Sequence, residues 1–423
     1  MNRISTPRVL HVVENLDRGA VENWLLRMLE HANRRGIRLD WSFYCQLDRP
    51  GALDEKARTL GAAVIHSPVP IGSKARFIHA FRRELKHGRY DVLHCHHDLI
   101  SAVYLAASLG LTIDRRIVQV HNADEEVLTS NALKRRLYRE PLRLACLYGS
   151  NSIAANSNHA LDTFLAHRKR REDRDIVCYY GVDPAPFEKA AGNRAQFRRD
   201  LAMPEDALIV LFAGRLVPEK NPLFAVDVTA ELHRRNPRVF AVFAGAGSLE
   251  SALRDRADAL KISQAVRLIG WRNDLPEVMS CCDWFILPRP ESPMEGFGLA
   301  VAEAQLAGLR LLVSRGIADD PLLPGACFRR LPLASGPIRW AEAALELLSE
   351  AAPQPRTAFE ALRRSPMDMD NALSTLLALH SKEAAVLRRK NGLHTRLSGL
   401  PDDRSATEPM VDRKPDISLA KSS

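Results

Sequence analysis

The stretch "PMEGFGLAVAEA" (residues 293–304) places Glu295 and Glu303 on either side of a glycine-rich turn. The apolar run "DWFILP" (283–288) precedes the turn and ends at a proline, so it predicts a short buried strand. The two glycines of "EGFG" permit a tight turn and the close approach of a ligand to the backbone. The run "LAVAEAQLAG" that follows has helical spacing and stops at a glycine. The segment therefore predicts a strand, a glycine-rich loop and a helix in succession.

The two glutamates restrict the kind of ligand that such a loop could bind. Unpaired amides at the start of a helix attract anions, and phosphate above all. A carboxylate beside a phosphate would repel it, so we expect Glu295 and Glu303 to contact neutral, hydroxyl-rich parts of the ligand. A phosphate flanked by hydroxyl acceptors suggests a sugar nucleotide. The alternative is that Glu295 caps the helix and Glu303 lies on its solvated face, where most charged residues lie.

Short apolar runs alternate with longer helical patterns along most of the chain, which predicts strands separated by helices. The first group of predicted strands comprises residues 8–13, 39–45, 62–68, 90–96, 115–122 and 151–157. After the segment "IVCYYGVDPAPF" (176–187) the pattern restarts, with predicted strands at 207–214, 240–247, 265–271, 283–288 and 310–315. This alternation predicts parallel sheets covered by helices on both faces.

We therefore expect an α/β protein with two doubly wound, Rossmann-like domains that face each other across a cleft. Ligands of such sheets bind at the carboxyl ends of the strands, so the cleft is the expected site. The predicted parts are an N-terminal domain (1–180), a C-terminal domain (181–366), a helical segment (367–391) and a tail (392–423). The tail has no periodicity and is expected to be disordered. The chain contains neither GxGxxG after a strand nor GxxxxGK[ST], which argues against a nicotinamide enzyme or a P-loop kinase.

Four motifs, in this order, carry a resemblance to a known family. They are "VLHVVENLDRGAVENWL" (9–25), "YYGVD" with a following phenylalanine (179–187), "FAGRLVPEKNP" (212–222) and "EGFGLAVAEA" (295–304). Together they resemble the retaining glycosyltransferases of family 4, which have the GT-B fold and of which many build bacterial surface polysaccharides. The resemblance covers roughly residues 8–380. It implies that residues 1–180 form an acceptor-side domain and that residues 181–366 form a nucleotide-sugar-binding domain.

The resemblance implies roles for several residues. Arg215 and Lys220 would bind the diphosphate, a role that suits a guanidinium fork and a compact ammonium group. Glu303 would hold the ribose hydroxyls, and Glu295 would lie beside the donor sugar. The backbone amides of Phe297, Gly298 and Leu299 would face sugar or phosphate. For the two cations, the alternative is a pair of solvated surface charges.

Three further residues are assigned by the same resemblance. His121 ends a predicted strand and would lie against the donor sugar, although a histidine there could also bond a local carbonyl. Trp271 falls where the family contacts the nucleobase, and could equally be a core aromatic. Gly19 belongs to the family's first glycine loop, but this chain has Gly19-Ala20 where the family usually has two glycines. Alanine is strained there if the position needs a positive φ, and harmless if it opens the helix.

Basic residues are concentrated in the first part of the chain. Residues 1–180 carry 28 Lys and Arg against 20 Asp and Glu, a net +8 out of +9 for the whole chain. The segment 74–89 adds a helical stripe of Phe77, Ile78, Phe81 and Leu85 flanked by Arg and Lys. Such a face suits an anionic membrane, or is an amphipathic helix packed on a core. A nucleic-acid partner is not expected, because no exposed aromatics are interleaved with the basic residues.

Histidine and cysteine patterns do not favour a metal or a disulfide. The run "HCHH" (94–97) lacks the ligand spacing of known metal sites, and a strand end explains it as well. The seven cysteines contain no CxxC and lie mostly in apolar surroundings, so we expect reduced core residues. No apolar stretch approaches the roughly 20 residues that span a bilayer, and the first residues lack a signal-peptide pattern. These features predict a cytoplasmic protein, peripheral at most on the inner face of the plasma membrane.

The predicted reaction is transfer of a sugar from a nucleoside diphosphate to an acceptor hydroxyl of a glycan or lipid-linked molecule, with retention. Arg215, Lys220 and the helix amides would stabilise the charge on the leaving diphosphate, so neither a metal nor another cofactor is expected. The alternatives are another GT-B enzyme, such as a sugar-nucleotide epimerase, and a non-catalytic binding member. The sequence leaves the sugar, the nucleobase and the acceptor open.

Overall fold

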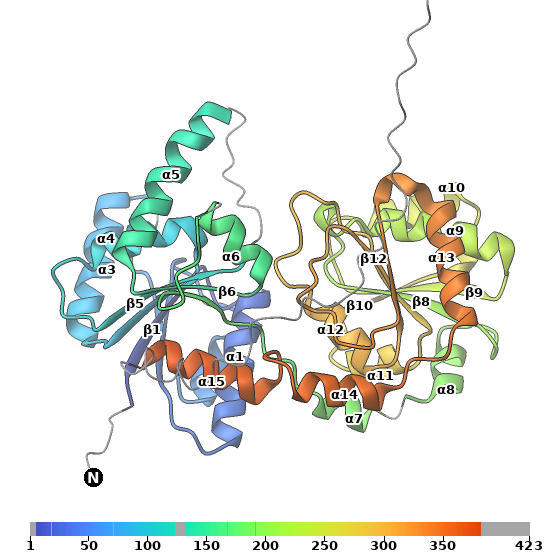
Figure 1. Ribbon diagram of the computed structural model, residues 1–423, viewed down its shortest axis with the longest axis horizontal. Helices are drawn as coiled ribbons and strands as arrows, with labels where there is room; N and C mark the ends of the chain where they lie inside the picture. Colours follow the sequence, from blue (N-terminus) through green and yellow to red (C-terminus); the bar gives the residue numbers. More distant parts are fainter. Residues whose placement is uncertain are drawn as a thin grey trace, which may run out of the picture. The chain divides into compact units, whose positions relative to one another are not determined.

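The computed structural model describes residues 6–381, apart from residues 18, 71, 123–131, 167 and 191 and the side chains of 132–137. These residues form two parallel sheets with helices around each (Figure 1). The predicted tail (392–423) and the end of the predicted helical segment (367–391) lie outside the described residues. The predicted domain boundaries themselves remain predictions.

The first sheet is built from seven parallel strands in the order β3-β2-β1-β4-β5-β6-β7. These strands are β1 (Arg8–Val13), β2 (Asp40–Cys45), β3 (Ala63–His66), β4 (Val92–Cys95), β5 (Arg115–Val120), β6 (Ser152–Ala155) and β7 (Asp175–Val177). The helices among them are α1 (Ala20–Arg34), α2 (Asp54–Thr59), α3 (Lys74–Gly88), η1 (Asp98–Ile100), α4 (Ser101–Ala107), α5 (Ala132–Gly149) and α6 (Asn158–Leu165). The chain order reverses between β1 and β4, which is the switch point where doubly wound sheets bind ligands.

The second sheet has six parallel strands in the order β10-β9-β8-β11-β12-β13. These strands are β8 (Leu208–Ala213), β9 (Val239–Ala244), β10 (Val266–Gly270), β11 (Trp284–Leu287), β12 (Arg310–Ser314) and β13 (Phe328–Leu331). Around them lie α7 (Ala185–Lys189), α8 (Arg194–Asp200), η2 (Pro218–Lys220), α9 (Pro222–Arg235), α10 (Glu250–Ala259), η3 (Ser263–Ala265), α11 (Leu275–Ser280), α12 (Leu299–Leu306), η4 (Leu333–Ser335), α13 (Gly336–Ser349) and α14 (Pro355–Arg363). The last helix, α15 (Met369–His380), lies beside the first sheet. The switch point of the second sheet lies between β8 and β11. The predicted pair of doubly wound α/β sheets is confirmed.

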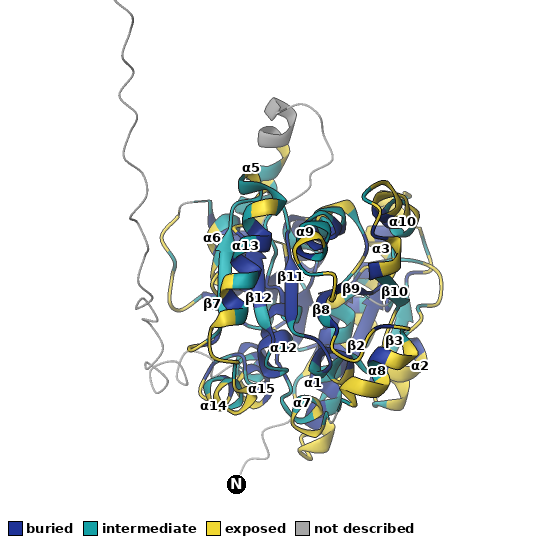
Figure 2. Ribbon diagram, turned by 90° about the vertical axis from the view of Figure 1, so that its right-hand side faces the viewer, coloured by how far each residue is buried: buried dark blue, intermediate teal, exposed yellow. Residues whose placement is uncertain are grey.

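The apolar runs of the sequence form the buried strands of each sheet, because removing apolar side chains from water is the main favourable free-energy change in folding. Each of the eleven predicted runs contains a strand. Figure 2 shows strands such as β8 and β11 as buried, whereas helices such as α2 and α10 carry exposed faces. Four fully buried tryptophans fill the cores: Trp24, Trp41, Trp284 and Trp340.

Two edge strands are absent from the predicted set. β13 has the sequence "FRRL" and is only partly buried, so its two arginines conceal it from a search for apolar runs. β7 has three residues and falls at the start of the segment that we interpreted as the junction. Both lie at the end of a sheet, where a strand needs only one buried neighbour.

Helix α3 carries the apolar stripe for which the sequence left two interpretations. Phe77, Phe81 and Leu85 are buried in a core that also contains Leu10 and Tyr44. These three residues therefore hold α3 against the first sheet, as in the second interpretation. Ile78 does not share this face and is 36% exposed, so the prediction that it belongs to the same stripe is wrong. Within the described residues no helix is both long and apolar enough to cross a bilayer.

The last helix returns to the first sheet. The chain passes through α13 and α14 beside the second sheet, and then α15 packs beside α1 (Figure 1). Val182 N–H donates to the Met367 carbonyl at 2.9 Å, and the His31 ring bonds to Asp370 at 2.7 Å. Leucines of α15 join the core that contains Trp24. The end of the described chain therefore packs with the first sheet. We call the first sheet with its helices and α15 the first lobe, and the second sheet with its helices the second lobe.

Candidate functional site

The first part of the site is the loop between β8 and α9, which carries both predicted phosphate ligands. Arg215 lies two residues after the end of β8 and is exposed, while Lys220 is the last residue of the short helix η2. Asn221 then adopts a left-handed conformation with φ of 52°. Its amide Nδ2 donates to the Pro288 carbonyl at 3.0 Å, which fixes this loop against the end of β11. The predicted cations therefore lie at the switch point of the second sheet.

The Lys220 ammonium group is paired with Glu295, the first glutamate of the glycine loop. Lys220 Nζ lies 2.5 Å from Glu295 Oε2, and the side chains are 17% and 15% exposed. Arg289 Nη1 lies 3.1 Å from the same carboxylate oxygen. Arg215 acts on both members of the pair through its charge. Three cations therefore surround one carboxylate, which leaves an excess of positive charge for an anionic ligand.

The protonation states of this pair follow from burial and from the surrounding cations. Burial alone would raise the pKa of Glu295, but the attraction of Lys220 and Arg289 outweighs it and lowers that pKa. Burial also lowers the pKa of Lys220, and the charge of Glu295 opposes this effect. Glu295 is therefore ionised at neutral pH. Its carboxylate holds the Lys220 ammonium group in place.

The glycine loop forms the start of helix α12. Gly298 is the residue before the helix and has φ of 82°, a conformation that glycine adopts without strain. The Phe297 side chain is 2% exposed and packs against the rings of Tyr179 and Tyr180. The backbone of Phe297, Gly298 and Leu299 therefore lies at the amino end of α12, where helix amides have no partner within the helix.

Gly296 lies close to another part of the backbone, whereas we expected the glycines of this loop to lie close to a ligand. A Cβ atom there would lie 2.1 Å from the His121 carbonyl oxygen. The glycine thus permits contact with the backbone that follows β5, rather than with a ligand. Asn156 Nδ2 donates to the same carbonyl at 2.9 Å. The loop that carries Glu295 is in this way held against the carboxyl end of the first sheet.

Glu303 lies one turn into α12 and meets a residue of the first lobe. Its carboxylate Oε1 is 3.6 Å from Arg27 Nη1 of α1, and the Glu303 side chain is 16% exposed. Burial raises the pKa of Glu303, and the nearby guanidinium of Arg27 opposes that shift. The alternative that Glu303 lies on a solvated face of the helix is therefore wrong. Its carboxylate is a partly buried acceptor that a hydroxyl group could bind.

His121 lies where β5 ends, and both of its ring nitrogens are engaged within the protein. Nδ1 is 2.7 Å from the Tyr180 hydroxyl, and Nε2 is 3.0 Å from Nδ1 of His96. Its backbone N–H donates to Asp98 at 2.8 Å. Burial lowers the pKa of His121 to about 3, so its ring is neutral. The ring is close to the glycine loop, and contact with a sugar would require one of its hydrogen bonds to be exchanged.

The first glycine loop resolves the question that Ala20 raised. Gly19 is the residue before α1 and has φ of −78°, while Ala20 is the first helical residue. Ala20 is therefore unstrained. The Gly19 carbonyl accepts from the Asn23 side chain at 2.8 Å. The Glu22 carboxylate folds back so closely that a Cβ atom on Gly19 would lie 2.1 Å from it.

Trp271 follows β10, two strands away from β8 in the second sheet. Its side chain is 53% exposed, so the alternative that it is a core aromatic is wrong. The Gly270 carbonyl accepts from Gly245 N–H at 2.8 Å, which aligns the carboxyl ends of β9 and β10. Trp271 is thus at the same edge of the sheet as Arg215 and is free to stack on a planar ligand.

Four contributors to this site were not identified from the sequence. Arg289 and Arg27 look like ordinary surface cations, because no motif marks them. Glu22 lies within the first quoted motif but was given no role, and no motif marks Asp98; burial raises their pKa values to about 7 and about 6. Only the fold brings these side chains to the two glycine loops. Together the described residues form a loop rich in cations with two acidic acceptors beside it.

Two family models match separate parts of this chain. The model for Glycosyltransferase Family 4 matches residues 21–186, and the model for Glycosyl transferases group 1 matches residues 193–318. The second match contains Arg215, Lys220, Glu295 and Glu303. EpsF of Bacillus subtilis (strain 168) is one of the curated proteins to which this chain is similar, and its name calls it a glycosyltransferase. The two are 24% identical over 89% of this chain and 97% of EpsF.

A second relative is named for a defined reaction. The UDP-Gal:alpha-D-GlcNAc-diphosphoundecaprenol alpha-1,3-galactosyltransferase of Escherichia coli is 24% identical over 62% of this chain and 67% of its own length. Among solved structures, Anabaena Alr3699/HepE in complex with UDP and glucose has a TM-score of 0.71 at 16% identity. That match covers 90% of this chain and 100% of HepE. WaaG, described as a glycosyltransferase involved in lipopolysaccharide biosynthesis, has a TM-score of 0.65 at 16% identity, over 88% of this chain and 100% of WaaG. At such identities these structures show a shared fold.

Proposed function

Because this chain belongs to the family-4 glycosyltransferases of GT-B fold, we propose that it transfers a sugar from a nucleoside diphosphate to an acceptor hydroxyl with retention. The observation that carries this proposal is the group of three cations around Glu295 at the start of α12. A cluster with excess positive charge beside unpaired helix amides suits a diphosphate. The adjoining carboxylates suit the hydroxyl groups of a sugar and a ribose.

In the proposed mechanism the diphosphate gains negative charge as the glycosidic bond breaks. Arg215, Lys220 and the amides at the start of α12 are positioned before the reaction and stabilise that charge. Lys220 exchanges its contact with Glu295 for a phosphate oxygen. Arg289 remains beside Glu295, so this carboxylate keeps a cation when Lys220 turns away. Glu295 then accepts a hydrogen bond from the donor sugar.

The remaining groups are given roles by their positions. Glu303 binds the ribose hydroxyls, Trp271 stacks on the base, and His121 lines the sugar site beside Gly296. We propose that the departing phosphate takes the acceptor proton on the same face of the sugar. The transfer step then uses no metal ion, other cofactor or protein base.

We further propose that the acceptor is a glycan or a lipid-linked molecule at the inner face of the plasma membrane, and that no nucleic acid is a partner. The basic excess of residues 1–180 supports this location. Helix α4 adjoins both α3 and α5, and this part of the first lobe exposes Ile78, Ile100, Leu109 and Tyr148. Arg83 and Lys86 of α3 are exposed as well. Arg82 is not expected to contact the membrane, because its guanidinium group donates to the carbonyls of Ala107 and Leu109 at 2.6 and 2.7 Å.

The transferase proposal is tested by screening nucleoside-diphosphate sugars for a shift in melting temperature, then assaying each hit with lipid-linked acceptors. Proton NMR of the product should give the same anomeric configuration as the donor. An inverted product would overturn the retaining mechanism. Release of free sugar or an epimerised nucleotide without transfer would favour another GT-B activity, and tight binding without turnover would favour a non-catalytic member.

The membrane proposal is tested by co-sedimentation with liposomes of varied charge. Arg83→Glu with Lys86→Glu should weaken binding to anionic vesicles, because each basic group near such a surface adds about 1 kcal/mol. The matched control reverses two exposed cations of the second lobe, Arg254 and Arg356. Equal binding of wild type to neutral and anionic vesicles would contradict the proposal.

A further inference from the structure

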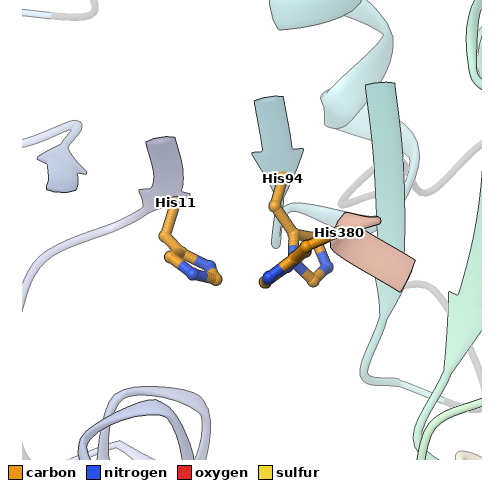
Figure 3. Close-up of side chains that lie close together, drawn as sticks. All are labelled: His11, His94 and His380. Carbon is orange, nitrogen blue, oxygen red and sulfur yellow. The ribbon is translucent and has the colours of Figure 1, made fainter. Parts of the chain in front are cut away.

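Three histidines from distant parts of the chain meet inside the first lobe. His11 lies in β1, His94 lies in β4, and the two are paired in the register of the sheet. His380 is the last residue of α15, 286 positions after His94. Each histidine offers one ring nitrogen, and these three nitrogens lie within 4.8 Å of one another. Figure 3 shows the three side chains. The figure shows the three rings converging from two strands and one helix.

These three imidazoles are buried and neutral, and their hydrogen bonds are incomplete. They are 0%, 0% and 3% exposed. Burial lowers the pKa of His94 to about 3 and lowers those of His11 and His380 well below the usual value. Within the described residues, His11 Nε2, His94 Nε2 and His380 Nδ1 have no hydrogen-bond partner. A neutral imidazole is the form that binds a metal, so no proton has to leave the three rings.

The hydrogen bonds around the cluster match those of metal-binding histidines. His11 Nδ1 lies 3.0 Å from His96 Nε2, so an N–H at Nδ1 can be donated there while Nε2 keeps a free lone pair. His94 Nδ1 and His380 Nε2 lie 3.0 Å apart. An ion between these two nitrogens would take the place of their shared proton, which moves to the other nitrogen of its ring. The rings themselves would move little, because zinc–nitrogen bonds of about 2.0–2.1 Å place tetrahedral ligands roughly 3.4 Å apart. Gln119 lies against His94 and can accept its other N–H.

We propose that His11, His94 and His380 bind one divalent transition-metal ion, best matched by zinc, and that this ion fastens α15 to the first sheet. An all-imidazole set selects zinc, cobalt, nickel or copper rather than magnesium or calcium, which need oxygen ligands. The rings of Trp41 and Phe43 lie against His11 and cover that side of the site with apolar surface. The ion would be structural and would enter during folding. This role is separate from the sugar transfer proposed above.

A second group of possible ligands is a useful contrast. Cys45, Asp54 and His66 also lie within 4.8 Å of one another. There His66 Nε2 is bonded to Asp54 at 2.7 Å, and Nδ1 lies 3.2 Å from the Leu47 carbonyl. Both nitrogens of His66 are therefore occupied. His66→Gln is accordingly the matched control for a change in the three-histidine site.

The experiment uses the full chain without a polyhistidine tag, expressed with zinc and analysed for metal after gel filtration. We expect close to one equivalent of zinc per chain, as for a structural site. His380→Gln should remove most of this zinc, whereas His66→Gln should retain it. Wild-type protein refolded with cobalt should show the intense visible bands of tetrahedral cobalt, and His380→Gln should not.

Two outcomes would overturn the proposal. One is wild-type protein that is folded yet contains no stoichiometric metal after refolding with zinc or cobalt, in which case a water molecule bridges the rings. The other is undiminished metal in folded His380→Gln. If that variant does not fold, the wild-type metal content and cobalt spectrum decide alone. Sugar transfer is not used as a readout, so this result is independent of the proposed function.

Discussion

At the scale of single residues, Lys220 has one carboxylate partner. Its contact with Glu295 neutralises a buried cation. Removing one partner of a buried ion pair destabilises a protein by much more than forming the pair stabilises it. The pair therefore connects a residue proposed to bind phosphate with the residue proposed for sugar recognition.

Replacing the proposed phosphate ligands should slow catalysis without unfolding the protein. Lys220→Ala and Arg215→Ala should each raise the barrier by about 2.7–4 kcal/mol, as the loss of one preorganised electrostatic group does. Turnover with the preferred nucleotide sugar and the melting temperature should be measured together. Arg254→Ala on the exposed face of α10 is the control. Wild-type turnover in both folded variants would contradict the assignment of the phosphate site.

The two glutamates should separate into different functions. Glu303→Gln should weaken binding of the bare nucleoside diphosphate, because a ribose contact is made with or without the sugar. Glu295→Gln should chiefly reduce transfer, since its proposed ligand is the sugar itself. Calorimetry with the bare diphosphate compares the two variants. Equal losses of affinity would show that the roles are not divided in this way.

The residues of the site that motifs mark were predictable, and those that only tertiary structure brings in were not. Arg215, Lys220, Glu295 and Glu303 lie in glycine-containing segments whose local structure can be inferred from nearby residues. Arg27 reaches Glu303 from another lobe, 276 positions earlier in the chain, so no local pattern could reveal the pair. The assignments of these residues as donor ligands remain predictions.

At the scale of the element, the start of α1 combines a glycine, an alanine and a buried acid. The strand pattern and the helix pattern located β1 and α1 correctly, but neither indicates that the Glu22 side chain turns back toward Gly19. Hydrophobic periodicity reports which face of a helix is buried. It says nothing of a polar side chain in the first turn.

The stability of the protein should depend on the charge of Glu22. Burial, together with the charges of Glu14 and Asp17, raises its pKa from 4.5 to about 7. Between these pH values the folded state binds more protons than the unfolded state, so this group makes the unfolding free energy fall as pH rises. Glu22→Gln should therefore gain stability relative to wild type from pH 5 to pH 8, by at most about 3 kcal/mol.

Denaturant unfolding at several pH values measures this difference directly. The exposed Glu55→Gln, in α2, is the control and should show no comparable change. A pH-independent difference between Glu22→Gln and wild type would mean that the carboxyl group is solvated in solution.

At the scale of the whole molecule, the described chain is held together by a helix that crosses back. α15 follows the second sheet in sequence but buries Leu373, Leu376 and Leu379 in the core that contains Trp24. Its helical pattern was predicted from the sequence, because leucines recur at helical spacing. Its location beside α1 was not predicted, since a pattern gives the buried face of a helix but not its partner.

Removing one leucine of this helix should destabilise the first lobe. Leu376→Ala should lower the unfolding free energy by about 2–5 kcal/mol, because Leu376 is fully buried and its loss leaves a cavity. Ser374→Ala, on the exposed face of the same helix, should change little. Chemical denaturation followed by tryptophan fluorescence would report the loss, since Trp24 lies in this core. Equal stabilities of the two variants would show that α15 is not packed against the lobe in solution.

The return of α15 also bears on how the protein is made. The ribosome completes α1 about 340 residues before it completes α15, and at 5–20 residues per second this interval lasts on the order of tens of seconds. During that time the apolar core around Trp24 lacks the leucines that α15 later contributes. The nascent first lobe is thus a natural client for a chaperone that binds apolar segments. Its final packing must await the release of nearly the whole chain.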